Sequence, residues 1–249
     1  MTGSVDSLNR VSQASLVDEL KSLTQDAGID LTDHQLNQLV EHLLLVIEKN
    51  ASLNLTRITS PTEALVLHIL DSLLLADACS QAPDGRYLDM GTGAGFPGIP
   101  LRIVSARDAV LLDSVGKKVA AVQEFCDQLH LDRVECVHAR LEDYAVEHLN
   151  GFAVITARAV ASLPVLIEYA TPLLQRGGLF VAAKARPEES ELEAGDRAAD
   201  ICGLRRVAYS EFELPNELGH RTVIVYQSVS RPSCKLPRQA GAAKRHPLG

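Results

Sequence analysis

Hydrophobic residues recur at helical spacing near the start of this 249-residue chain. Leu16, Leu20 and Leu23 fall at positions i, i+4 and i+7, which places their side chains on one face of a helix. Gly28 follows this run and is typical of a helix end. The pattern therefore predicts an N-terminal helix with one apolar face.

Two capping motifs predict further helices in the same region. Residues Thr32 to Gln35 form a capping box in front of apolar positions that continue to Ile47. Residues Ser60 to Glu63 form a second capping-box pattern, with a proline at the first helical position. The stretch 65–75 is apolar on nearly every side, so we expect it to be buried. We predict a helical extension over residues 1–80.

After Gly85 the pattern changes to short apolar runs that alternate with longer helical stretches. Such alternation indicates βαβ units and a mostly parallel sheet, and a weaker strand pattern surrounds Val207. The predicted fold class is α/β, a Rossmann-like sheet over residues 81–230 with helices on both faces. The clear runs are Tyr87–Met90, Ala109–Leu112, Val134–Val137, Phe152–Ile155, Leu179–Ala182 and Thr222–Val225.

Charge is distributed unevenly along the chain, whose formal net charge is −8. Residues 185–199 are rich in glutamate, and we expect a solvated helix there. Residues 231–249 hold five basic residues and no acidic one. We predict that 231–249 form a basic C-terminal tail that is irregular and mobile, which is a hint of contact with a polyanion.

The composition indicates a globular protein of a reducing compartment. No run of eighteen apolar residues is present and the N-terminus lacks a signal pattern, so we expect a cytoplasmic protein without membrane contact. The five cysteines include no C-x-x-C pair, so we expect neither a metal site nor a disulfide framework. We also expect a monomer.

The strongest local motif is a glycine-rich loop between a predicted strand and a predicted helix. Glycine lets such a loop approach a ligand closely because no Cβ intervenes. Gly91, Gly93 and Gly95 match the G-x-G-x-G pattern of S-adenosylmethionine sites. The set of Gly93, Gly95 and Gly98 also matches the G-x-G-x-x-G pattern of dinucleotide sites. The glycine spacing alone leaves both cofactors open.

Neighbouring residues favour S-adenosylmethionine. Asp89 can orient the loop or the methionine end of the cofactor, at a position where dinucleotide sites usually have an apolar residue. Pro97 removes one of the backbone amides that a pyrophosphate uses. Asp113 ends the next strand and can accept hydrogen bonds from both ribose hydroxyls of either cofactor.

Two later strand ends complete the predicted pocket, because ligands bind outside the carboxyl ends of the strands in such sheets. After the third strand, Leu141 can pack on adenine while Glu142 or the local backbone contacts the edge of the ring. After the fourth strand, Arg158 stands where the transferred methyl group should point. Structural alternatives are a helix-start acid for Glu142 and a surface ion pair for Arg158.

The fourth strand also bears on the methyl acceptor. Exocyclic amines of adenine or cytosine usually require an Asn/Asp-Pro-Pro-aromatic run here, and cytosine carbon requires a cysteine nucleophile. Thr156-Ala157-Arg158 supplies neither. Guanine N-7 needs neither, because its lone pair is free and it loses no proton before attack. The strand is therefore consistent with guanine N-7, and no catalytic residue is assigned.

These motifs lie in blocks that resemble the RsmG (GidB) family of bacterial 16S ribosomal RNA guanine N-7 methyltransferases. The thirteen-residue glycine block is the most specific of them. The blocks are Asn54-Leu55-Thr56, His68 to Leu73, Asp89 to Leu101, Leu112-Asp113-Ser114 with Gly116-Lys117-Lys118, and Arg158-Ala159. The resemblance implies methyl transfer from S-adenosylmethionine to one guanine of 16S ribosomal RNA, with this RNA or the small ribosomal subunit as partner.

The resemblance also implies cofactor contacts at Gly91, Phe96, Leu141, Glu142 and Arg158. Lys184 matches a family lysine after the fifth strand, and we predict that Arg158 and Lys184 bind the substrate together with the basic tail. The predicted cofactor-binding residues are Gly91, Gly93, Phe96, Asp113, Leu141, Glu142 and Arg158. His68 and Asp71, about one helical turn apart, are interpreted as a satisfied buried polar pair.

Three other functions are weighed against this one. A methyltransferase of a small molecule or a protein would share only the cofactor half. An NAD-dependent oxidoreductase would use the second glycine pattern, but Asp89 speaks against it. A non-catalytic ribosome-assembly factor would have a vestigial pocket, which the intact loop and Asp113 disfavour.

Overall fold

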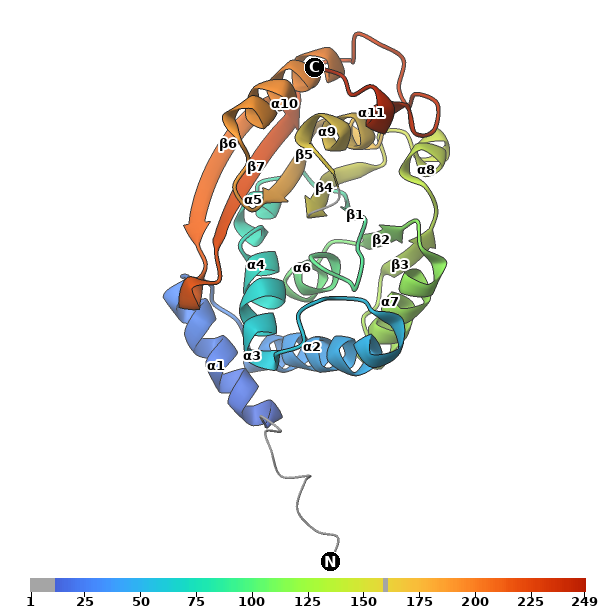
Figure 1. The fold of residues 1–249 in the computed structure, drawn as a ribbon. Coiled ribbons are helices and arrows are strands. Elements are labelled where there is room, and N and C mark those ends of the chain that lie inside the picture. The colour runs from blue at the N-terminus through green and yellow to red at the C-terminus, as the bar shows by residue number, and fades with distance from the viewer. Residues whose placement is uncertain (1–11, 159–160) are drawn as a thin grey trace, which may run out of the picture.

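A seven-stranded mixed sheet forms the centre of the molecule (Figure 1), in a computed structural model that describes residues 12–158 and 161–249. The strand order is β3-β2-β1-β4-β5-β7-β6, with β7 antiparallel to both of its neighbours and the other adjacent pairs parallel. The strands are β1 (Arg86–Met90), β2 (Ala109–Asp113), β3 (Val134–His138), β4 (Phe152–Arg158), β5 (Leu174–Lys184), β6 (Leu204–Glu213) and β7 (His220–Ser228). All six clear strands and the weak one near Val207 are confirmed.

The central strands are buried on both faces, which explains why their sequences are nearly continuous apolar runs. Every residue of β2 is buried, and β4 is buried up to Arg158 at its end. The edge strand β6 is exposed along most of its length, so its sequence lacks such a run.

Helices cover both faces of the sheet, as expected for the α/β class. They are α1 (Gln13–Asp26), α2 (Asp33–Leu53), α3 (Pro61–Ala64), the π-helix η1 (Leu65–Leu70), α4 (Asp71–Leu73), α5 (Ala76–Ser80), α6 (Gly98–Val104), α7 (Gly116–Gln128), α8 (Leu141–Glu147), α9 (Leu163–Ala170), α10 (Glu189–Cys202), the 3-10 helix η2 (Pro215–Glu217) and α11 (Ala242–Arg245). The capping box at Thr32 has both of its hydrogen bonds, and the Ser60 side chain accepts one from the Glu63 amide.

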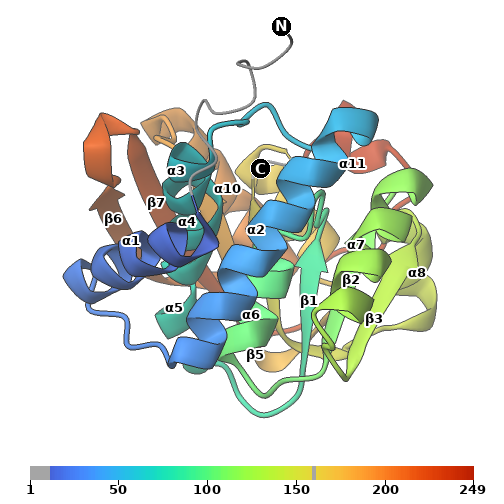
Figure 2. The same cartoon turned by 90° about the horizontal axis from the view of Figure 1, so that it is seen from below.

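The N-terminal helices pack on the face of the sheet that also carries α6 and α7 (Figure 2). Leu39 and Leu43 of α2 share one apolar cluster with Ile99 of α6 and Phe125 of α7. The segment 65–75, predicted to be buried, contributes Leu65 and other side chains to the same cluster. The division of the chain at residue 80 stays a prediction, and this shared cluster joins the two parts.

Two expectations are wrong. The glutamate-rich helix begins at Glu189 rather than at residue 185, and it is amphipathic, because Leu192 and Ala198 are buried in the core cluster that also holds α9. The C-terminal tail is irregular apart from α11, but it does not stand free of the body. Ala243 is only 2% exposed and belongs to the same core cluster, since the tail docks beside α9 (Figure 1).

Two parts of the sequence analysis lie outside the described residues. These are the polar N-terminal stretch, residues 1–10, and Ala159 of the block Arg158-Ala159. In the described part of the chain, no helix is both long and apolar enough to cross a membrane.

Candidate cofactor and substrate site

A cavity of about 530 Å³ opens at the carboxyl ends of β1, β2 and β4. This place is the switch point of the sheet, where the strand order reverses between β1 and β4, and ligands of α/β proteins bind at such points. The volume is in the range of small-molecule sites. The lining residues are Gly91, Gly93, Leu112, Asp113, Ser114, Lys118, Ala139, Arg140, Leu141, Glu142, Arg158, Tyr169, Gly241 and Lys244.

The glycine loop between β1 and α6 forms one wall of this cavity. Gly91, Gly93 and Gly95 all have φ between +61° and +91°, a backbone region that glycine adopts without the strain a Cβ would cause. At Gly98 a Cβ would lie 2.4 Å from the Leu111 side chain, so close packing also requires glycine. The loop thus presents bare backbone to the cavity.

Asp89 holds the loop from inside the core. One carboxylate oxygen accepts a hydrogen bond from the Gly98 amide at 2.9 Å, and the other accepts one from the Thr156 hydroxyl at 3.2 Å. Burial is the main cause that raises the pKa of Asp89, to about 6. Of the two roles expected for Asp89, its position fits orientation of the loop, since it is fully buried and does not line the cavity.

Asp113 holds the same loop from the cavity side. Its Oδ2 accepts a hydrogen bond from the Gly93 amide at 3.0 Å, and its Oδ1 accepts one from the Val115 amide at 2.9 Å. A carboxylate has about four acceptor positions, so lone pairs remain for ligand hydroxyls. Asp113 therefore combines a structural role with a surface suited to a ribose.

The opposite wall comes from α8, α9 and the C-terminal tail. Leu141 and Glu142 begin α8, as placed by the third strand end, and Tyr169 of α9 faces the same space. The Gly241 amide donates a hydrogen bond to Glu142 Oε1 at 2.8 Å. Burial is the largest cause that raises the pKa of Tyr169, to about 12, and the nearby Glu142 carboxylate adds to it. The tyrosine hydroxyl therefore remains protonated and neutral at neutral pH.

Arg158 reaches the cavity from the end of β4 and is held by the N-terminal helices. Its Nη1 donates to Asp71 Oδ2 at 2.8 Å and to the Leu67 carbonyl at 3.0 Å. Arg221 of β7 donates two hydrogen bonds to the same Asp71 carboxylate, which is buried. One buried anion thus fixes two guanidinium groups, and the surface ion pair considered for Arg158 is replaced by a buried one.

His68 completes this cluster without a direct bond to Asp71. A guanidinium can only donate, so the contact of 3.4 Å from Arg158 makes His68 Nδ1 an acceptor. Nε2 then carries the proton and donates to the Thr56 hydroxyl at 2.9 Å. Burial, followed by the Arg158 charge, lowers the pKa of His68 to about 3. His68 and Asp71 are each satisfied by other partners rather than by one another.

Phe96 and Lys184 are not among the residues that line the cavity. The Phe96 ring is buried and stacks on His68, with 4.6 Å between ring centroids, and the Arg158 guanidinium lies 5.6 Å from its centre. Lys184 pairs with Glu191 at 2.7 Å, beside a separate hollow of about 260 Å³ that Arg221 also lines. The cavity therefore brings together Gly91, Gly93, Asp113, Leu141, Glu142 and Arg158, but not these two.

Several lining or neighbouring residues were not predicted. Arg221 carries no local motif, and Tyr169 lies in a helix that is apolar on nearly every side. Gly241 and Lys244 belong to the tail, where the glycine was a signal for a turn but gave no hint of its partner. Their roles depend on contacts between distant parts of the chain.

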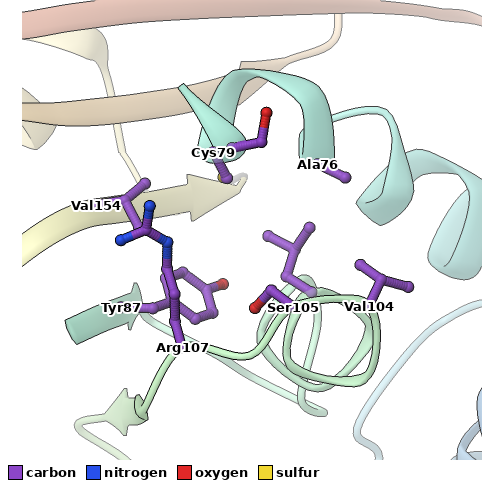
Figure 3. Close-up of a pocket in the computed structure, with 9 residues that line it drawn as sticks. Ala76, Cys79, Tyr87, Val104, Ser105, Arg107 and Val154 are labelled. Atoms are coloured by element: carbon purple, nitrogen blue, oxygen red, sulfur yellow. The ribbon is translucent and has the colours of Figure 1, made fainter. Parts of the chain in front are cut away.

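A second, smaller cavity of about 100 Å³ lies beside the first half of β1 and β4 (Figure 3). Tyr87 and Cys79 line it, and Arg107 closes its edge by donating to three backbone carbonyls. Burial raises the pKa of the Cys79 thiol to about 12, so this sulfur stays protonated. None of the predicted site residues lies here, and the cavity is mostly apolar.

The large cavity fits S-adenosylmethionine. The positive-φ glycines present backbone, Asp113 offers acceptors for ribose hydroxyls, and Leu141 supplies an apolar surface for adenine. The antiparallel β7 between β5 and β6 departs from the 3-2-1-4-5-6 strand order that is typical of dinucleotide-binding sheets. No group of three or more His, Cys, Asp or Glu side chains in residues 12–158 and 161–249 is arranged to hold a metal ion.

Solved structures share this architecture. A putative sarcosine dimethylglycine methyltransferase from Galdieria sulphuraria superposes with a TM-score of 0.53 at 12% identity, over 69% of this chain and 89% of the other. TYW2 of P. horikoshii in complex with MeSAdo gives 0.53 at 14% identity, over 66% and 63%. These likenesses and the strand order give the chain the Rossmann-like fold of these methyltransferases, with the large cavity at the carboxyl ends of its strands.

Sequence comparison narrows this class to one family. The family model described as GidB, rRNA small subunit methyltransferase G, matches residues 35–219. The "Ribosomal RNA small subunit methyltransferase G" of Desulfitobacterium hafniense (strain Y51) is 37% identical over 227 residues, which cover 90% of this chain and 94% of the relative. The chain therefore belongs to the rRNA small subunit methyltransferase G family. This membership excludes the NAD-dependent oxidoreductase alternative.

Proposed function

We propose that this protein transfers a methyl group from S-adenosylmethionine to N-7 of one guanine in 16S ribosomal RNA. The observation that carries the proposal is the fixed Arg158 guanidinium at the end of β4, in a cavity of a family member. The reaction would take place in the cytoplasm, on the RNA or the small ribosomal subunit.

We propose that the protein acts as a monomer. Light scattering after gel filtration tests this oligomeric state.

S-adenosylmethionine, when bound, supplies an electrophilic methyl group on a sulfonium. The chain's own residues would bind and orient it, with Gly91, Gly93 and Asp113 on one wall and Leu141 and Glu142 on the other. Both carboxylates of the cavity already accept hydrogen bonds from backbone amides. They are therefore suited to binding and positioning rather than to proton removal, which N-7 does not require.

Arg158 is proposed to recognise guanine. Guanine offers an acceptor, O6, next to N-7, and arginine donors commonly bind this edge. Adenine has an amino group in place of O6, so two donors would face one another. Asp71 and the Leu67 carbonyl fix the guanidinium, which limits the entropy lost on binding the base. Phe96 would act through Arg158 rather than by touching the ligand, and Lys184 would act at the neighbouring hollow.

The test is incorporation of labelled methyl groups into 16S ribosomal RNA from a strain that lacks this protein. We expect one labelled guanine, located by chain cleavage at 7-methylguanosine. Label in another base, or at another atom of guanine, would contradict the proposal. Label in a small molecule or a protein instead of RNA would show that the substrate belongs to a different class.

Substitution of Arg158 tests the recognition step. Arg158→Ala should reduce methylation by about a hundredfold or more, because one charged hydrogen bond contributes about 1.5–3 kcal/mol and the base loses its positioning. Arg158→Lys keeps the charge but not the planar pair of donors, and should restore only part of the activity. Arg197→Ala, in an exposed ion pair with Glu193 away from the cavity and the hollow, is the matched control. Equal activity of Arg158→Ala and the control would refute this role.

A further inference from the structure

The C-terminal segment 236–248 lies where a cofactor must bind, although its basic composition suggested only RNA contacts. Gly241 and Lys244 are part of the cavity lining, opposite the glycine loop. Both sit in the short stretch that contains α11, which packs against α9. We call residues 236–248 the C-terminal clasp.

An ion pair with a buried carboxylate anchors the clasp to the body. The Arg238 guanidinium donates to both carboxylate oxygens of Glu168, from Nε at 2.6 Å and from Nη2 at 2.5 Å. Glu168 lies on α9 with only 3% of its surface exposed, and Arg238 also donates to the His246 carbonyl at 2.7 Å. A paired, planar contact of this kind fixes position as well as distance. The ion pair therefore sets where the clasp lies along α9.

Apolar contacts support the same placement. Ala243 is buried in the cluster formed by α8, α9 and α10, and Leu236 and Leu248 pack against that cluster from both ends of the clasp. The clasp thus packs apolar side chains against the body at its two ends and at Ala243, as a structural element does. A tail that served only to attract phosphates would gain nothing from this packing.

Gly241 connects the clasp to a predicted cofactor residue. Its φ of +77° turns the chain so that the backbone amide donates to Glu142 Oε1 at 2.8 Å. Glu142 also lies next to the Tyr169 hydroxyl, with which it is coupled electrostatically. The clasp therefore determines which way the Glu142 carboxylate faces in the cavity.

We propose that the C-terminal clasp is part of the S-adenosylmethionine site, with Arg238 and Gly241 as positioning residues that hold Glu142 and the cavity wall. Arg238 fixes the clasp on Glu168, Gly241 orients Glu142, and Lys244 covers the cavity edge. The identity of the ligand rests on the proposed function, whereas the contacts of the clasp with Glu168 and Glu142 are independent of it. When the clasp is undocked, the wall that it forms with α8 and α9 loses Gly241 and Lys244, so the cofactor binds more weakly and leaves faster.

The experiment compares two single-charge deletions in the full-length protein, Arg238→Ala and Lys235→Ala. Both remove one positive charge from the basic tail, but Lys235 is exposed and does not line the cavity. We expect Arg238→Ala to raise the dissociation constant of S-adenosylmethionine, measured by calorimetry, about tenfold, since a docked fraction near one tenth weakens binding by that factor. Lys235→Ala should bind as the wild type does.

Two further measurements keep the test decisive if Arg238→Ala folds poorly. Arg238→Lys retains a charge beside Glu168 and should recover part of the affinity. In the unchanged protein, saturating S-adenosylmethionine should slow amide hydrogen exchange at residues 238–245, including the Gly241 amide. Unaltered exchange in this segment, or wild-type affinity of Arg238→Ala, would overturn the proposal.

The outcomes separate the clasp from the function itself. Wild-type protein that binds S-adenosylmethionine but labels no ribosomal RNA would refute the substrate and leave the clasp testable by binding. Equal losses of RNA methylation in Arg238→Ala and Lys235→Ala, with unchanged cofactor affinity, would instead make the segment an RNA contact and refute the clasp.

Discussion

The glycine loop and the C-terminal clasp contribute to opposite walls of one cavity and are held there in different ways. The loop is held on both sides by carboxylates, Asp89 from the core and Asp113 from the cavity, within a stretch of about twenty-five residues. The clasp is held by apolar packing, by one ion pair and by one amide–carboxylate bond, and the partners in these two bonds lie 70 and 99 positions away. The first wall is built into the sheet, whereas the second is added to it. In one binding site, a preformed wall can therefore face a wall part that is displaced with a smaller loss of free energy.

The largest expected effect is on the loop itself. In Gly98→Val a Cβ would meet the Leu111 side chain at 2.4 Å and an Asp89 oxygen at 2.7 Å, so the loop must shift. We expect S-adenosylmethionine affinity, measured by calorimetry, to fall by more than about a hundredfold, that is, by about 2.7 kcal/mol. Gly177→Ala, whose Cβ would have open space around it, is the control for replacing a glycine without a steric clash and should bind normally. Normal binding by Gly98→Val would show that the loop is as displaceable as the clasp.

The next prediction concerns Asp89, the carboxylate that holds the loop from the core, and its contribution to the free energy of unfolding, which depends on pH. The pKa of Asp89 is about 6 in the folded protein and 3.8 when exposed, so the folded state favours the protonated form. This stabilisation is complete below pH 3.8 and is lost as pH rises through 6; it amounts to roughly 3 kcal/mol. The free energy of unfolding of wild type minus that of Asp89→Asn should therefore fall over this pH range and stay level above it. Denaturant melts at several pH values measure it, and parallel pH curves would contradict it.

A smaller loss of cofactor affinity is expected when Asp113, the carboxylate on the cavity side of the loop, is replaced. Asp113→Ala removes the acceptor of two backbone amides, and hydrogen bonds to a charged group contribute about 1.5–3 kcal/mol each, so cofactor affinity should fall about thirtyfold. This loss is still larger than the one expected for Arg238→Ala. Asp113→Asn keeps one acceptor and should lie between Asp113→Ala and wild type. A smaller loss for Asp113→Ala than for Arg238→Ala would reverse the ranking of the two walls.

Those parts of the fold and of the site that depend on a local sequence pattern could be predicted from the sequence. Central strands such as β2 are apolar runs because both faces are covered, and the loop glycines follow from backbone geometry near a ligand. Strand β6 gave only a weak signal because most of its residues are exposed on an edge. Asp89 and Asp113 could be placed at strand ends, but which hydrogen bonds they make could not be inferred from their position in the chain.

The remainder depends on contacts between distant segments. The clasp was expected to be mobile because nothing near Arg238 indicates the buried Glu168 that binds it. Lys184 was assigned to the substrate from its match to a family lysine, which does not indicate that its nearest partner is Glu191 of the next helix. Arg221 was overlooked for the same reason, since 150 positions separate it from Asp71.

The Asp71, Arg158 and Arg221 cluster has a consequence for the synthesis of the protein. Its three members come from the first third, the middle and the last strand of the chain, so the cluster cannot form before residue 221 has been translated. A stop codon or frameshift between residues 159 and 221 removes Arg221 and the clasp while every residue of the glycine loop is still made. Such a product would leave Asp71 with one of its two counter-charges and the cavity without Gly241 and Lys244. A late nonsense mutation should therefore abolish activity as completely as an early one.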